Sequence, residues 1–144
     1  PRRAALSFPV LAVLAAASLP AAAQSMRPGE WQFTTTMNSP MMDKPQVGTV
    51  SKCVSETQAD DPASFMGGDQ AAGCAITRGP KAPGSYSWTI ACERQGVSGN
   101  GKAWYGPDKI ESEIRLTIAL KEGGQQMEMT NRTLGRYLGP CKAK

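Results

Sequence analysis

Residues 110–121 read IESEIRLTIALK and form the clearest strand pattern in the chain. Apolar residues and one serine fill every second position from Ile110 onward, while charged residues and threonine take most positions between them. Such alternation is typical of a β-strand that turns one face to a core and the other to water. Residues 31–37, WQFTTTM, repeat the period with Trp31, Phe33, Thr35 and Met37 on one face. These two stretches predict an all-β, mainly antiparallel protein.

Weaker strand patterns lie around these two, separated about every ten positions by glycine, proline and other turn residues. They fall near residues 47–54, 74–78, 85–93, 102–105 and 125–130, and Gly99-Asn100-Gly101 is interpreted as a hairpin turn. The period breaks at residues 55–65, where Thr57 followed by Asp60 predicts a short helix with a hydroxyl cap. We predict a single curved sheet or a small barrel of seven to eight strands, with one short helix after Cys53.

The four cysteines are expected to form two disulfides. Cys74 and Cys92 lie nine positions either side of Pro83, so a hairpin centred there places them opposite each other within disulfide range. Elimination then pairs Cys53 with Cys141. The spacing favours this connectivity over the other two.

The start of the chain has the pattern of a signal peptide. Arg2 and Arg3 precede an apolar, alanine-rich run, residues 4–19, and a small-residue cleavage site, Ala21-Ala22-Ala23-Gln24. We predict a signal-peptide helix at residues 1–23 and one disulfide-stapled domain at 24–144, secreted to the periplasm. The export route stays open between ordinary secretion and the twin-arginine pathway. No later run approaches the ~20 apolar residues of a spanning helix, so no membrane span is expected in the mature form.

Charge and composition exclude several classes of function. The formal charge of +4 includes Arg2 and Arg3, which leave with the signal, and the balance that remains argues against nucleic-acid binding. The chain has no histidine, which removes the usual general base and the commonest transition-metal ligand. Two carboxylate pairs, Asp60-Asp61 and Glu111/Glu113, are interpreted as solvated charges rather than catalytic acids. We therefore expect neither an enzyme nor a cofactor.

Aromatic and methionine residues supply the two candidate sites. Aromatic side chains in a curled sheet can line an apolar ligand cavity. The candidate cavity residues are Trp31, Trp88, Trp104, Tyr86 and Tyr105. Methionine thioethers are the soft ligands that copper(I) prefers, although methionine also fills irregular cores. The alternative copper ligands are Met37, Met41, Met42, Met127 and Met129.

Four short motifs together resemble the bacterial family catalogued as domain of unknown function 3617. They are Pro28-Gly29-Glu30-Trp31, a lone cysteine before the segment from Thr57 to Pro62, a cysteine pair bracketing Trp88, and residues 135–141, GRYLGPC. The pattern would read Gly-Leu-Trp at residues 29–31, whereas the chain has Glu30 in place of the leucine. The resemblance implies a small exported envelope protein, mostly of Gram-negative bacteria, with no established activity. We expect a non-catalytic periplasmic protein that binds an apolar small molecule, a lipid or another envelope protein.

Overall fold

The computed structural model describes residues 25–62, 73–80, 82–121 and 124–142. The expected signal peptide at residues 1–23 lies outside the described residues. Within the described residues, no helix has the length and apolar character needed to cross a membrane.

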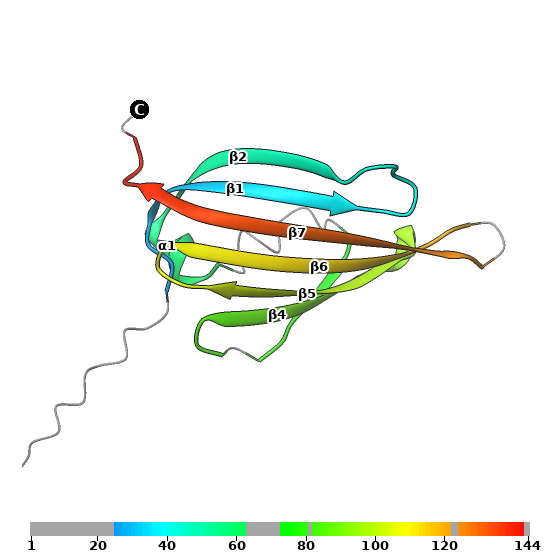
Figure 1. Ribbon diagram of the computed structural model, residues 1–144. Coiled ribbons are helices and arrows are strands. Elements are labelled where there is room, and N and C mark those ends of the chain that lie inside the picture. The colour runs from blue at the N-terminus through cyan, green and yellow to red at the C-terminus, as the bar shows by residue number, and fades with distance from the viewer. Residues whose placement is uncertain (1–24, 63–72, 81, 122–123, 143–144) are drawn as a thin grey trace, which may run out of the picture.

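Seven antiparallel strands of the described residues form one sheet, which confirms the all-β prediction (Figure 1). The strands lie in the order β2-β1-β7-β6-β5-β4-β3. Their bounds are β1 Gly29–Asn38, β2 Gln46–Val54, β3 Ala75–Arg78, β4 Ser85–Cys92, β5 Val97–Tyr105, β6 Lys109–Ala119 and β7 Gln126–Gly139. Because β2 and β3 pair on one side only, the sheet is open. Of the two shapes expected, the curved sheet is therefore the one found.

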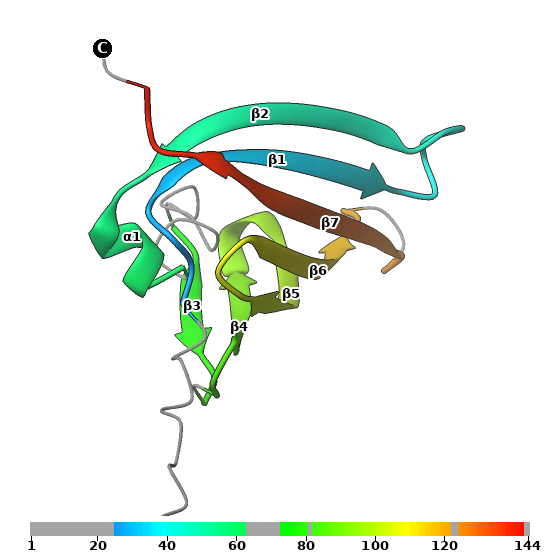
Figure 2. The same ribbon diagram turned by 60° about the vertical axis from the view of Figure 1, so that its left-hand side comes forward.

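The sheet curves strongly, with α1 (Glu56–Asp60) at one end between the two edge strands (Figure 2). A capping box starts this helix. The Ser55 hydroxyl accepts a hydrogen bond from the Gln58 amide, and the Gln58 side chain accepts one from the Ser55 amide. The expected helix is present, but its cap is Ser55 rather than Thr57.

The hairpin turn expected at Gly99-Asn100-Gly101 is wrong, because these residues lie inside β5. Gly101 pairs with Trp88 of β4, and a side chain at Gly101 would overlap the Trp88 indole. A strand glycine can mark a place where a neighbouring group approaches closely. Here the missing side chain leaves room for the tryptophan ring.

The last strand is longer than the pattern at 125–130 suggested. β7 continues to Gly139 and lies between β1 and β6 in the middle of the sheet. A register shift between Glu30 and Trp31 of β1 leaves Leu138 as an extra residue between their partners, Gly139 and Tyr137.

Both disulfides join the cysteines that were expected to pair. Cys74 and Cys92 tie the β3–β4 hairpin with a Cα separation of 4.1 Å. Cys53 and Cys141 lie with their Cα atoms 5.5 Å apart and join β2 to the residues just after β7. The second bond therefore crosses β1, which lies between those two strands.

Two clusters of buried side chains fill the end of the sheet nearest α1. The first contains Met26, Trp31, Phe33, Val54, Ala59 and Ile110, with Tyr105 and Tyr137 packed against it. The second contains Tyr86, Trp88 and Ala103, with Tyr105 and Ile114 packed against it. Tyr105 contacts both clusters, so this end of the sheet has a continuous core.

Candidate functional site

Strand alternation gives the sheet a core-facing, concave side and a convex side. Strand pairing places Phe33, Gly135, Ile110 and Tyr105 in one row across four strands, on the core side. Away from α1, the same side carries apolar residues that are half-buried rather than buried. We call this set the open apolar face: Met37, Ile90, Val97, Ile114, Leu116, Ile118, Met127 and Met129.

The open apolar face is continuous across neighbouring strands. Leu116 of β6 pairs with Met129 of β7, and Ile118 pairs with both Met127 of β7 and Val97 of β5. On the other side of Leu116, Gly99 of β5 has no side chain, and a Cβ there would crowd the leucine. The face is therefore built from residues of five strands.

Asn131 interrupts this apolar surface next to the core. It pairs with Met37 on one side and Ile114 on the other. Its Oδ1 atom is buried and accepts no hydrogen bond within the described structure. A buried acceptor without a donor is costly, so this oxygen favours a bound group that donates a hydrogen bond.

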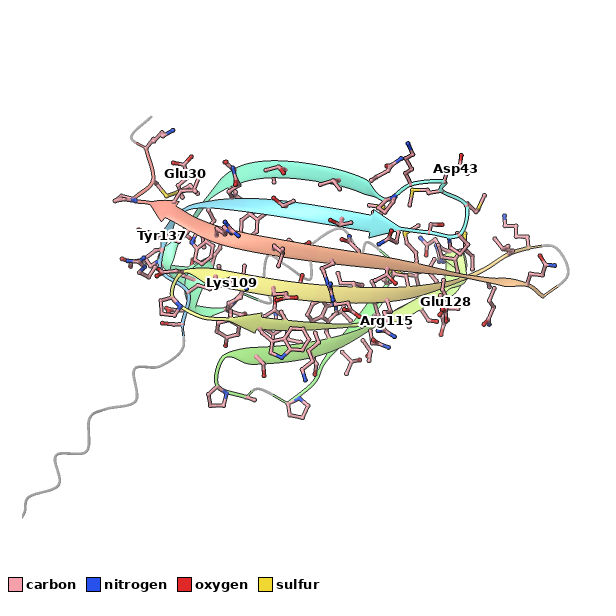
Figure 3. The ribbon with its side chains drawn as sticks, viewed as in Figure 1. Glu30, Asp43, Lys109, Arg115, Glu128 and Tyr137 are labelled. Carbon is pink, nitrogen blue, oxygen red and sulfur yellow. A yellow bond between two sulfur atoms is a disulfide. The ribbon has the colours of Figure 1, made fainter. Side chains whose placement is uncertain are left out.

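The convex side is polar and carries an ion-pair ladder on β6 and β7, where Figure 3 labels Arg115. Glu113 accepts hydrogen bonds from Arg115 at 2.9 Å and from Arg132 at 3.2 Å. The bond from Arg115, followed by that from Arg132, lowers the pKa of Glu113 below its usual value. Glu111 lies 4.0 Å from Arg132. A carboxylate held ionised in this way is a poor proton donor.

The predicted aromatic residues fall into three places. Trp31 is fully buried in the first core cluster, whereas Tyr86, Trp88 and Tyr105 lie together at the second. Tyr86 lies 5.2 Å from Trp88 and 5.9 Å from Tyr105, measured between ring centroids. Trp104 is on the convex side, 46 % exposed, with the Lys102 ammonium 5.1 Å from its ring centroid. The five residues therefore do not line one common cavity.

A small pocket of about 150 Å³ lies where α1 ends against the β3–β4 hairpin. Its lining residues are Asp60, Asp61, Pro62, Arg78, Gly79, Tyr86, Ser87 and Tyr105. Arg78 and Asp61 form an ion pair at 3.0 Å. The Tyr86 hydroxyl is buried and has no hydrogen-bond partner in the described part of the chain. Burial, followed by the charges of Asp61 and Tyr105, raises the pKa of this hydroxyl, which keeps it protonated as a donor.

Three of the five methionines share the open apolar face. Met37 lies on β1 and Met127 and Met129 lie on the neighbouring β7, and Ser39 donates a hydrogen bond to the Met127 sulfur at 3.6 Å. Met42 is half-buried and Met41 is 77 % exposed in the turn between β1 and β2, where Figure 3 labels Asp43. Among the described residues, no group of three or more Cys, Asp or Glu side chains could hold a metal ion.

The pocket beside Tyr86 was not found from the sequence. Asp61 and Arg78 are 17 residues apart and lie in segments with no shared motif. The only sequence signal was the proline at position 62 that follows the helix, because it places Asp61 at a chain reversal next to β3. The pocket becomes visible only once the contact between the end of α1 and the β3–β4 hairpin is known.

Comparisons with known proteins give a single family. A family model described as "Protein of unknown function (DUF3617)" matches residues 26–141. No curated protein and no solved structure matches the chain.

Proposed function

The chain belongs to the DUF3617 family of proteins of unknown function, and we propose that it is an exported, non-catalytic periplasmic protein that binds a lipid acyl chain. Export is supported by the leader pattern at residues 1–23 and by two disulfides, which persist in oxidising compartments. A role without catalysis is supported by the lack of histidine and by the ion pairs that hold Asp61 and Glu113.

The open apolar face is the observation that carries the proposal. Its side chains lie beside the core, are half-buried, and are continuous over β4, β5, β6, β7 and β1. An apolar surface of this kind gains free energy when another apolar group removes it from water, at about 25 cal/mol per Å². An extended acyl chain can lie along such a continuous apolar surface. A ligand hydroxyl or protonated carboxyl can donate to the buried oxygen of Asn131.

Two neighbouring substitutions on β6 test the face. Leu116→Gln places an amide on the open apolar face, whereas Thr117→Gln places the same amide on the convex side of the same strand. We expect the wild type to bind dodecanoic acid in calorimetric titrations. Leu116→Gln is expected to weaken binding about tenfold, the cost of losing part of one buried leucine contact. Thr117→Gln should retain the wild-type affinity.

Two results would contradict acyl-chain binding. One is the absence of dodecanoic acid binding by the wild type. This result would contradict the proposal even if the protein were found to bind another envelope protein. The other is an equal affinity for wild type and Leu116→Gln, because the ligand would then lie elsewhere on the molecule. Native mass spectrometry of protein purified from the periplasm adds an independent reading, since a bound lipid would appear as a mass increment.

A second candidate function, copper(I) binding, is favoured by the placement of the methionines. Met37, Met127 and Met129 lie on one side of two paired strands, where thioether sulfurs can converge on a soft cation. Competition with a chromogenic copper(I) chelator tests this. The variant Met127→Leu/Met129→Leu should no longer take copper(I) from the chelator. Met26→Leu, at a buried methionine in the first core cluster, should still do so. A wild type that leaves all copper with the chelator contradicts this second candidate.

A further inference from the structure

The pocket beside Tyr86 is separate from the open apolar face and has the features of a ligand-binding site. Tyr86 is 7 % exposed and lines the pocket, and its hydroxyl has no partner among the described residues. A buried hydroxyl left without a hydrogen bond is destabilising, and a bound acceptor would remove that cost. The unpartnered hydroxyl therefore indicates a site for a ligand atom rather than a structural contact.

The charges around the pocket restrict the ligand. The Asp61 carboxylate balances the Arg78 guanidinium 3.0 Å away, and Asp60 adds a further negative charge to the lining. An anion would meet this excess negative charge, and any ion would lose hydration on entry. The lining therefore favours an uncharged molecule.

The size and the apolar lining restrict it further. The volume of about 150 Å³ equals that of an engineered cavity that holds benzene. Pro62 and the ring of Tyr105 supply apolar surface, while Tyr86 supplies the donor. The carboxylate of Asp61, half-exposed at the pocket, can accept a hydrogen bond in addition to that from Arg78.

We propose that this pocket binds an uncharged, ring-sized molecule carrying a hydroxyl or carbonyl oxygen, which accepts a hydrogen bond from Tyr86. The site uses α1, β3, β4 and the end of β5, and shares no residue with the open apolar face. The two binding proposals can therefore succeed or fail independently.

Phenol and toluene provide a matched pair of probes of similar size, because toluene carries a methyl group in place of the hydroxyl that Tyr86 would contact. In an NMR titration of the disulfide-bonded protein at millimolar probe concentrations, phenol should shift the backbone amides of Gly79, Ser87 and Tyr105. Toluene should bind more weakly than phenol. Benzoate, which has the same ring but a negative charge, should bind more weakly still.

Tyr86→Phe removes the donor and keeps the ring. The variant is expected to bind phenol about tenfold more weakly than the wild type while binding toluene with unchanged affinity. Retained toluene binding also shows that the variant is folded. Tyr137→Phe, at a tyrosine packed against the first core cluster and outside the pocket, serves as the matched control and should bind phenol like the wild type.

Two outcomes would overturn the proposal. Phenol affinities that are equal in wild type and Tyr86→Phe would show that the hydroxyl makes no bond to the ligand. Pocket amides that do not move on addition of phenol would show that the pocket holds water alone. Neither outcome bears on acyl-chain binding, which is read from different residues.

Discussion

At the residue scale, close packing of Trp88 on Gly101 explains why a glycine stands in the middle of β5. The two residues face each other across the β4–β5 pair, and a methyl group at position 101 would enter the indole ring. Tryptophan in a packed core cannot retreat without opening a void or straining its neighbours. The glycine is therefore part of the second core cluster, although its sequence context resembles a turn.

We predict that Gly101→Ala destabilises the protein by about 1–3 kcal/mol, the usual cost of overpacking a core. Urea unfolding monitored by tryptophan fluorescence measures this change. Gly48→Ala on β2 is the matched control, because a Cβ there meets no atom within 4 Å. Equal stability of the two variants would contradict the close contact between Gly101 and Trp88.

The ion pairs of Glu113 give a second prediction at this scale. Because Arg115 is the main cause of the lowered pKa of Glu113, Arg115→Gln should raise that pKa toward 4.5. Removing Arg132 should raise it by less. NMR titration of the Glu113 side-chain carboxyl measures both shifts.

The sign of the accompanying stability change follows from the lowered pKa. The paired carboxylate stabilises the folded protein above the unfolded pKa, and this contribution is lost as the pH falls through the folded pKa. Arg115→Gln should therefore lower the free energy of unfolding at neutral pH and leave it unchanged in strong acid. A Glu113 pKa that is unchanged in Arg115→Gln would contradict the contact at 2.9 Å.

At the element scale, the two disulfides restrain very different lengths of chain. Cys53 and Cys141 are 88 residues apart, whereas Cys74 and Cys92 are 18 apart within one hairpin. A crosslink that closes a longer loop removes more entropy from the unfolded chain, which gives about 4.5 kcal/mol for the first bond and about 3 kcal/mol for the second.

We predict that Cys53→Ser/Cys141→Ser loses more stability than Cys74→Ser/Cys92→Ser. Thermal unfolding of the two double variants, with the remaining disulfide intact in each, provides the comparison. A larger loss from the hairpin pair would contradict the entropic account and would point instead to native-state contacts of Cys92, which is buried.

The sequence predicted those elements in which side-chain chemistry alternates. The strand at Lys109–Ala119, the inward residues of Gly29–Asn38 and the facing cysteines of the β3–β4 hairpin were all predicted, because each depends on local spacing. The second half of β7 was missed. Its core-side positions are occupied by polar, small or aromatic residues that do not form an apolar alternation: Asn131, Thr133, Gly135 and Tyr137.

The helix and the aromatic residues show a different limit. Ser55 and Thr57 both offer a hydroxyl before the helix, and only the backbone geometry selects Ser55 as the cap. Trp104 was grouped with the other aromatic residues. Successive side chains of a strand point to opposite sides, so Trp104 lies on the side of β5 opposite to its neighbour Ala103. Ala103 is fully buried, so Trp104 lies on the convex side.

At the scale of the whole molecule, the order of the strands determines which strands lie at the edges of the sheet. Consecutive strands pair with each other except β2 and β3, and β7, already paired with β6, also returns to lie beside β1. This return leaves β2 and β3 as edges, and β3 has only four residues. Lys52 on β2 occupies a core-side position opposite Trp31, and an inward charge on an edge strand discourages pairing with another sheet.

The core is concentrated at one end of this open sheet. Both clusters and α1 lie at the end where β1 begins and β7 finishes (Figure 2). The other end of the same side keeps its apolar residues half-buried. Burying an acyl chain there would complete the side of the sheet that the described core leaves open.

Methyl NMR of the wild-type protein titrated with dodecanoic acid tests this account most directly. The account predicts that the methyl signals of Ile114, Leu116, Ile118, Met127 and Met129 shift together, while that of Leu134, 39 % exposed on the convex side, stays in place. Methyl shifts confined to Leu134, or no shifts at any of these residues, would contradict it.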